Sequence, residues 1–301
     1  MLPGVDNPIL SQIPILPEDI EIVNENIFQL PSPHITPKHM LILQKRIYQA
    51  VQEGVYKGIV ITHGTDTLEE TAYFLDISVT ARIPIVITGA MRSSNEVGSD
   101  GLYNFSNAIR VAAAEAAVNK GVLVVMNDEI HTARYVTKTH TTNVATFRTP
   151  THGPIGVTTK HEIRFFHQLN DYVKHHVESL DGSIPIVKAY AGMTGEIFDY
   201  LLQKEISGLV IEGLGAGNLP PEASIGLDRI LEAGIPCVLV SRCFNGIAEP
   251  VYAYEGGGVQ LEQKGVIFAN GINSQKARLK LLVGLNANLE SEALTRFFHD
   301  A

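Results

Sequence analysis

The chain has 301 residues, of which 45% are hydrophobic and 18% are charged, and its formal net charge is −9 at pH 7. This composition is typical of a globular protein with room for more than one domain, and it excludes a disordered or repetitive chain. Charges of both signs are scattered without a cluster of five or more Lys and Arg residues, which disfavours a nucleic-acid partner, because phosphate binding needs concentrated positive charge.

Helix-like and strand-like segments alternate along the chain. The first expected helix spans 36–54, with Thr36 as N-cap and Pro37 at the first helical position. Later helices are expected over 67–76, where Thr67 and Glu70 have the spacing of a capping box, and over 100–121, with Asp100 as N-cap. Apolar, β-branched runs typical of strands buried on both faces are GIVITHG (58–64), PIVITGA (84–90), GVLVVMND (121–128), PIVKAYA (185–191), GLVIEGLG (208–215) and PCVLVSR (236–242).

Two regions depart from this alternation. Residues 133–147 alternate Thr with apolar side chains, which predicts antiparallel strands or an extended hairpin. Residues 148–182 are polar and lack a clear period, so we interpret them as the close of a first domain and a linker. We therefore expect an α/β fold with a mostly parallel sheet flanked by helices. The expected domains are a larger one over 1–165 and a smaller one over 184–301, joined by a linker over 166–183.

The segment ITHGTDT (61–67) is the strongest candidate for a functional site. An apolar strand ends there, Gly64 permits a tight turn, and a helix follows at once. Ligands of open α/β sheets bind at the carboxyl ends of strands, where helix N-termini offer free N–H groups. Thr65 could supply a nucleophilic hydroxyl and Asp66 a carboxylate for a substrate ammonium group. The alternative is that both residues only cap the helix. His63 by itself favours a structural role.

Two other segments extend this candidate site. In PIVITGAMR (84–92) a strand again runs into small residues, Gly89 and Ala90, which let a ligand approach the backbone. Lys138, in VTKTHTT (136–142), either points to solvent or lies desolvated beside a threonine hydroxyl, where it could act as a base. A neighbouring Asp66 would oppose deprotonation of that amine.

Together these segments resemble the bacterial L-asparaginase/glutaminase family. THGTDTLEETAYFLD (62–76) is similar to an active-site signature of that family, and PIVITGAMR, GVLVVMND, VTKTHTTNVATF (136–147) and NGINSQKAR (270–278) are similar to family segments in the same order. The resemblance implies a larger N-terminal and a smaller C-terminal α/β domain, assembly as a dimer of dimers, and hydrolysis of L-asparagine to aspartate and ammonia. It implies no metal or organic cofactor, and it allows minor glutaminase activity beside the main reaction.

The resemblance also implies roles for particular residues. Thr65, Asp66 and Lys138 match a catalytic threonine–aspartate–lysine triad, with Thr65 and Asp66 also binding substrate. The remaining matches are to substrate-binding positions: a serine for the α-carboxylate, a backbone contact to the side-chain amide, and an asparagine contributed across the dimer interface. These positions are Ser32, Ala90 and Asn218.

One difference from the family pattern stands out. Family members begin with an apolar strand that ends in a TGGTI-like motif, whose first threonine is usually taken as the nucleophile. The present sequence starts at MLPGVDNPILSQI (1–13), which resembles the helical segment beyond that strand. We expect such a strand to lie near the middle of the parallel sheet, so that its loss would leave ladder groups unpaired. Three explanations remain open: a truncated product, a chain that works through Thr65 alone, or a catalytically impaired amino-acid-binding paralogue.

Further expectations concern the second domain and the location of the protein. A family glutamate that reaches the neighbouring site matches either Tyr254 or Glu255.

The start of the chain lacks a signal-peptide pattern, and no apolar stretch approaches the roughly 18 residues of a membrane span. The sequence therefore favours a cytoplasmic protein without membrane association. A subunit of a tRNA-dependent amidotransferase is an alternative that the acidic net charge disfavours.

Overall fold

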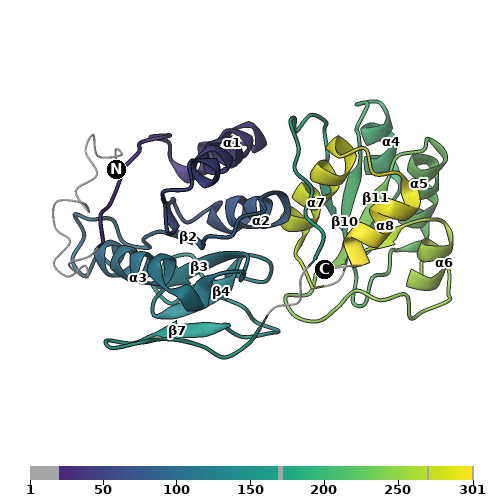
Figure 1. The fold of residues 1–301 in the computed structure, drawn as a ribbon. Coiled ribbons are helices and arrows are strands. Elements are labelled where there is room, and N and C mark those ends of the chain that lie inside the picture. Colours follow the sequence, from purple (N-terminus) through teal and green to yellow (C-terminus); the bar gives the residue numbers. More distant parts are fainter. Residues whose placement is uncertain (1–19, 169–171, 270, 300–301) are drawn as a thin grey trace. The chain divides into compact units, whose positions relative to one another are not determined.

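The computed structural model describes residues 20–168, 172–269 and 271–299, which form two compact units divided between Lys174 and His175. Figure 1 shows each unit as a sheet with helices packed against it. This division falls inside the expected linker over 166–183. The segment 1–13 and Asn270, the first residue of the NGINSQKAR segment, lie outside the described residues.

The first unit consists of short helices and strands that alternate up to β3 and are followed by strands alone. Its elements are η2 (Ser32–His34), α1 (Pro37–Glu53), β1 (Ile59–Thr62), α2 (Leu68–Ser78), β2 (Ile85–Thr88), α3 (Gly101–Ala113), η3 (Glu115–Ala117), β3 (Val122–Met126), β4 (Glu129–Thr132), β5 (Thr137–Lys138), β6 (Phe147–Arg148), β7 (Gly156–Thr158) and β8 (Ile163–Phe165).

Six of these strands form one sheet in the order β1-β2-β3-β4-β7-β8. The predicted apolar runs are confirmed as β1, β2 and β3, which pair in parallel, with Thr62 opposite Thr88 where β1 and β2 end. Every residue of β2 and β3 is buried, whereas β1 is only half-buried. The parallel half of the sheet therefore ends at an edge strand that is less covered than its neighbours.

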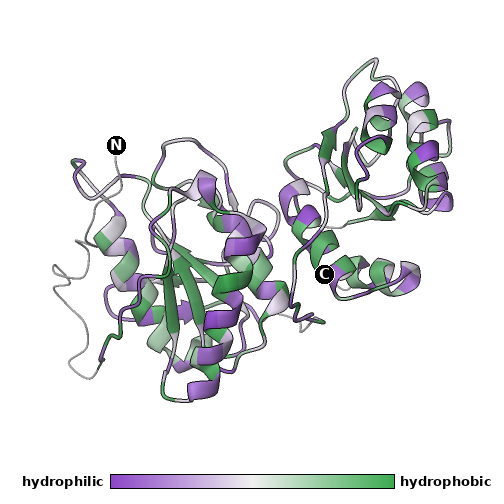
Figure 2. Ribbon diagram, turned by 90° about the horizontal axis from the view of Figure 1, so that it is seen from above, coloured by the Kyte–Doolittle hydropathy of each residue, from purple (hydrophilic) through white to green (hydrophobic). Residues whose placement is uncertain are grey.

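The helices cover this sheet with apolar side chains. Helix α3 packs against β1, β2 and β3, and its Ala108 and Val111 share a buried cluster with Val86 and Leu123. Helix α2 packs against β2 and β3 and also contacts α1. Figure 2 shows the apolar strands between helices that carry both apolar and polar residues. None of the helices in the described ranges combines the length and the apolar character that a bilayer crossing requires.

The prediction for residues 133–147 is confirmed, and three other details of the sequence analysis are wrong. β5 and β6 form a short antiparallel pair with Lys138 opposite Phe147. However, the stretch after 148 contains β7 and β8, whose antiparallel pairing gives the sheet a mixed character that its weak apolar pattern did not reveal. The expected helix over 100–121 ends at Ala113. Thr67 makes no side-chain cap, because its hydroxyl donates to the carbonyl of Ser32 instead.

The second unit is a four-stranded parallel sheet in the order β12-β11-β10-β9. The three predicted runs are confirmed as β9, β10 and β11, and Cys237 is a buried free thiol whose pKa burial raises to about 12. Its elements are β9 (Ile186–Lys188), α4 (Glu196–Leu202), β10 (Leu209–Gly213), α5 (Pro221–Glu232), β11 (Cys237–Ser241), α6 (Gly258–Gln263), β12 (Ile267–Phe268), α7 (Ser274–Asn286) and α8 (Ser291–His299).

Candidate functional site

The turn between β1 and α2 carries the first two candidate residues. β1 ends at Thr62 and α2 begins at Leu68, so Thr65 and Asp66 lie at the carboxyl edge of the parallel strands, in front of a helix N-terminus. Gly64 is required at the start of this turn, since a Cβ there would lie 2.8 Å from the Cβ of Ser32. The turn therefore holds the chain of Ser32 directly against the segment that carries Thr65.

Lys138 reaches this turn from the β5–β6 pair, more than 70 residues further along the chain. Its Nζ donates to Oγ1 of Thr65 at 3.0 Å and lies 2.8 Å from Oδ1 of Asp66. The Lys138 side chain is 16% exposed, whereas that of Asp66 is 57% exposed. The amine is thus the shielded member of the group, and the carboxylate faces solvent, where it can meet an incoming charged ligand.

Glu69 contributes to this arrangement and was missed by the sequence analysis. Its carboxylate is buried, and Oε1 accepts a hydrogen bond from Oγ1 of Thr137 at 3.2 Å and one from the backbone N–H of Lys138 at 3.5 Å. Glu69, in the first turn of α2, therefore anchors both residues of β5. These bonds fix the position from which the Lys138 amine reaches the site. The sequence carried little signal for this role, because Glu69 is followed by a second acidic residue, Glu70, in the same first turn of α2.

Ser32 is buried beside the turn, where its polar atoms contact the segment after Thr65. Its Oγ accepts a hydrogen bond from the N–H of Asp66 at 3.2 Å, and its carbonyl accepts one from Oγ1 of Thr67 at 2.7 Å. The structure therefore brings Ser32, Thr65, Asp66 and Lys138 together. The Ser32 hydroxyl keeps a donor proton for a further acceptor, such as a carboxylate oxygen.

Ala90 lies in the loop that follows β2, next to the Thr65 turn. The register of β1 and β2 brings the two strand ends together, and the methyl group of Thr65 lies 3.4 Å from where a Cβ on Gly89 would be. The Asp100 carboxylate, which does not cap α3, instead accepts the N–H groups of Met91 and Arg92 at 3.1 and 2.9 Å. The loop is thus fixed by backbone bonds that leave Ala90 beside the candidate triad.

Asn218 lies in the second unit, where it is buried and holds a tight loop. Its Oδ1 accepts from the N–H of Gly258 at 3.1 Å, and its Nδ2 donates to the carbonyl of Leu214 at 3.4 Å. Tyr254 and Glu255 are both exposed, and Tyr254 stacks on Tyr252 with ring centroids 5.4 Å apart. These contacts fix the Asn218 side chain within its own unit.

His63 packs beneath the candidate triad as a neutral, hydrogen-bonded residue. Its Nδ1 lies 2.7 Å from the carbonyl of Gly64, and its Nε2 lies 2.9 Å from Oγ1 of Thr71. A carbonyl can only accept, so the neutral ring carries its proton on Nδ1 and accepts the Thr71 hydroxyl at Nε2. Burial lowers the pKa of His63, because it penalises the charged imidazolium.

This burial predicts a pH dependence of stability. Because the pKa of folded His63 is lowered, the unfolded chain binds more protons below the unperturbed pKa of about 6.5, and the His63 contribution to folding falls as the pH drops through that value. We expect the free energy of unfolding, measured by urea titration between about pH 7.5 and 5.5, to decline less steeply in His63→Gln than in the parent chain. An NMR titration placing the pKa of His63 above the unperturbed value of about 6.5 would contradict the assignment.

Comparison with known proteins shows which family the chain resembles. Residues 4–171 match the family described as Asparaginase, N-terminal, and residues 183–298 match the Glutaminase/Asparaginase C-terminal domain. The chain is 35% identical to an L-asparaginase of Bacillus licheniformis over 93% of its length and 87% of that protein. It is 40% identical to a probable L-asparaginase of Deinococcus radiodurans, over 95% of its length and 88% of that protein.

A solved structure supports the same relationship. The crystal structure of a probable cytoplasmic L-asparaginase from Campylobacter jejuni superimposes with a TM-score of 0.89 at 30% sequence identity, covering 98% of this chain and 93% of that one. Both domain families, matched in order over most of the sequence, agree with the arrangement of sheets and helices described above. The chain belongs to the asparaginase family.

Proposed function

We propose that this chain hydrolyses the side-chain amide of L-asparagine to L-aspartate and ammonia, with Thr65, Asp66 and Lys138 as its catalytic residues. The observation that carries the proposal is the convergence of a hydroxyl, a carboxylate and an amine, with Nζ of Lys138 3.0 Å from Oγ1 of Thr65 and 2.8 Å from Oδ1 of Asp66. Relatives described as L-asparaginases at 33–40% identity support the same reaction.

The geometry assigns each atom a part in acyl transfer. The neutral amine of Lys138 takes the hydroxyl proton of Thr65 as Oγ1 attacks the side-chain carbonyl carbon of the substrate, and Asp66 stabilises the ammonium ion that results. The tetrahedral intermediate expels its nitrogen, which takes the proton now held by Lys138 and leaves as ammonia, and an ester forms on Thr65. Attack of water on that ester releases L-aspartate and restores the hydroxyl.

The neighbouring residues supply the binding contacts in this proposal. The hydroxyl of Ser32 donates to the α-carboxylate of the substrate, and the exposed oxygens of Asp66 accept from its ammonium group. The backbone at Ala90 contacts the side-chain amide. Asn218 acts on the site of a neighbouring protomer within a dimer of dimers, an assembly that light scattering after gel filtration would test.

The decisive measurement is ammonia release from L-asparagine by the purified full chain, compared with L-glutamine at equal concentration. We expect turnover with L-asparagine and a lower rate with L-glutamine. Calorimetric binding of L-aspartate without any ammonia release would contradict hydrolysis.

Location is a separate proposal: we place the protein in the cytoplasm. The Campylobacter jejuni relative is described as a probable cytoplasmic L-asparaginase, whereas a Haemophilus influenzae relative is described as periplasmic.

A further inference from the structure

The loop that follows β11 in the second unit has an exposed tip. β11 ends at Ser241, and the chain runs without helix or strand to Gly258, where α6 begins. Every residue of the segment 243–247 is exposed, whereas Ala248 is buried. The tip therefore meets solvent over the sequence CFNGI, in which an asparagine is followed directly by a glycine.

Hydrogen bonds hold the two ends of this loop. The N–H groups of Arg242 and Glu249 donate to carbonyls within 213–216 at 2.9 and 2.8 Å, and Oγ of Ser241 donates to a third carbonyl of that segment at 2.6 Å. Within the part of this unit that the structure describes, the tip adds only a bond from the N–H of Cys243 back to Oγ of Ser241. The ends of the loop are thus fixed, and its tip is restrained by little else.

Asn245 and Gly246 leave two groups free to react with each other. Among the residues that the structure describes, none forms a hydrogen bond with the carboxamide of Asn245 or with the backbone N–H of Gly246. Gly246 has a φ of +100°, a conformation that residues with a Cβ rarely adopt, and an added Cβ would meet no atom beyond its chain neighbours within 4 Å. The backbone nitrogen that follows Asn245 is therefore neither hydrogen-bonded nor covered.

We propose that Asn245 is a site of spontaneous deamidation. The backbone nitrogen of Gly246 attacks Cγ of Asn245 to close a five-membered succinimide ring, and the side-chain nitrogen leaves as ammonia with the proton that the Gly246 nitrogen gives up. Water then adds to one of the two ring carbonyls and opens the ring. Opening at one carbonyl leaves aspartate, and opening at the other leaves isoaspartate, whose backbone runs through the side-chain carbons. Neither step needs a bound ligand or the candidate triad.

The same loop geometry predicts that the modification disturbs the fold very little. Either product adds one negative charge at the tip, and isoaspartate lengthens the backbone there by one methylene group. The bonds of Arg242 and Glu249 keep the loop ends in place, and exposed loop tips tolerate such changes. We expect the thermal midpoints of the deamidated chain and of Asn245→Asp to lie within about 2 °C of the parent value.

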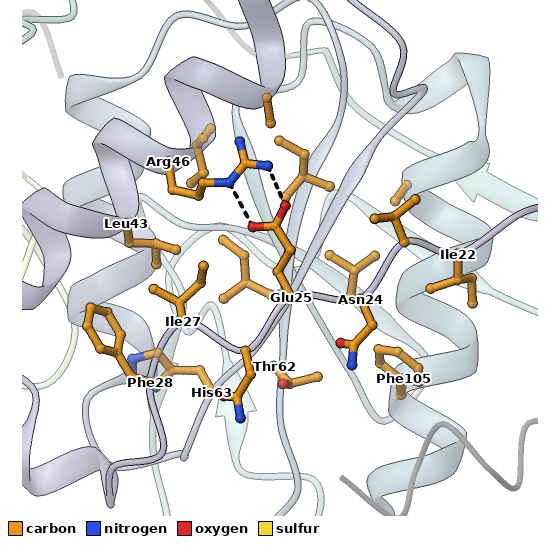
Figure 3. A pocket seen from close by; sticks show the side chains of 18 of the residues that line it. Ile22, Asn24, Glu25, Ile27, Phe28, Leu43, Arg46, Thr62, His63 and Phe105 are labelled. Atoms are coloured by element: carbon orange, nitrogen blue, oxygen red, sulfur yellow. Dashed lines mark hydrogen bonds and ion pairs between the residues drawn. The ribbon is translucent and has the colours of Figure 1, made fainter. Parts of the chain in front are cut away.

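Two other exposed asparagines provide a comparison within the same chain. Asn24 lies in an irregular segment, and Figure 3 shows it beside Glu25, whose carboxylate is held by Arg46. Asn143 is followed by a valine, and its Oδ1 accepts a backbone N–H at 2.9 Å. In both, the next residue carries a side chain that crowds the attacking nitrogen. We expect Asn245 to deamidate at least about tenfold faster than either, which corresponds to a barrier lower by about 1.4 kcal/mol.

The test is peptide mapping of the full chain during incubation at mildly alkaline pH and physiological temperature. Trypsin releases the fragment 243–264, in which Asn245 is the sole asparagine, and electron-transfer fragmentation separates isoaspartate from aspartate. We expect first-order loss of Asn245 with isoaspartate as the main product. Aspartate without isoaspartate would exclude the succinimide route, and loss no faster than at Asn24 and Asn143 would refute the site.

Three further samples establish how the reaction takes place. Asn245→Gln should leave the fragment unmodified over the same period, because the longer side chain would have to close a six-membered ring. The chain unfolded in guanidinium chloride should lose Asn245 within about threefold of the folded rate, since the tip is unrestrained. Reaction in the unfolded sample alone would overturn the proposal.

The third sample is Thr65→Val, which should deamidate at Asn245 as fast as the parent chain. Loss of the reaction in this variant would mean that the candidate triad of another copy carries it out, and the spontaneous route would be wrong. L-asparagine is absent from every sample, so the outcome is independent of the proposed hydrolysis, and either proposal can fail alone.

Discussion

Lys138→Met is expected to lower the rate of ammonia release from L-asparagine by about 10²- to 10⁴-fold, the usual contribution of a positioned general base. Methionine fills similar space along an unbranched stem but cannot take the proton of the Thr65 hydroxyl, from which Nζ of Lys138 is 3.0 Å away. The affinity for L-aspartate should change much less than the rate, because Ser32 and the Asp66 carboxylate remain. Steady-state kinetics would give the rate, and calorimetry would give the affinity.

The control for this variant is Lys160→Met, which removes a lysine charge at an exposed position of the same unit. It should leave the rate within about twofold, since exposed substitutions away from a site rarely matter. Lys138→Arg separates charge from proton transfer, because a guanidinium keeps the pairing with Asp66 yet does not deprotonate in proteins. If Lys138→Arg retained the parent rate, Lys138 would be a structural cation and not a base.

The strands of the sheets could be predicted from sequence because burial on both faces leaves a plain signature. GIVITHG, PIVITGA and GVLVVMND are continuous apolar runs, and β1, β2 and β3 lie within them. β7 and β8 carried no comparable signal, since each is three residues long; β7 has one half-buried residue between two buried ones, and β8 has no fully buried residue. Short strands of mixed burial depend on their partners, which a local pattern does not reveal.

The candidate site shows the same division between local and long-range information. The position of Thr65 and Asp66 follows from a strand, a glycine and a helix in sequence, and the turn lies where that order indicates. Lys138 lies on a two-residue strand whose placement depends on Glu69, more than 65 residues away in the chain. The expected capping box of Thr67 is replaced by a bond to Ser32, which lies 35 residues away in the chain. Pairings of this kind arise from tertiary packing. Family resemblance indicated roles for Ser32 and Lys138, but neither the bond of Glu69 nor that of Thr67 was predicted.

Thr65→Val is expected to reduce ammonia release by at least about 10³-fold, because it removes the proposed nucleophile while preserving a β-branched side chain. The retained methyl group keeps the packing of the turn beside Gly89, where even an added Cβ would lie 3.4 Å from Cγ2 of Thr65. Thr65→Ser is the matched control: it keeps the hydroxyl and loses the methyl group, so its rate should stay well above that of the valine variant. Retention of more than a tenth of the parent rate by Thr65→Val would exclude Thr65 as the nucleophile.

The double variant Thr65→Val/Lys138→Met tests whether the two residues act as one unit. Residues that share a proton transfer are strongly non-additive, so the double variant should be no slower than the worse single variant. Additive losses would mean that each residue contributes independently, which is incompatible with Lys138 acting through the hydroxyl it contacts. Nζ of Lys138 also lies 2.8 Å from Asp66, so the same cycle can be made with Asp66→Asn and Lys138→Met. Coupling between these two variants would show that the carboxylate acts through the amine. Additive losses would show that it acts directly on the substrate.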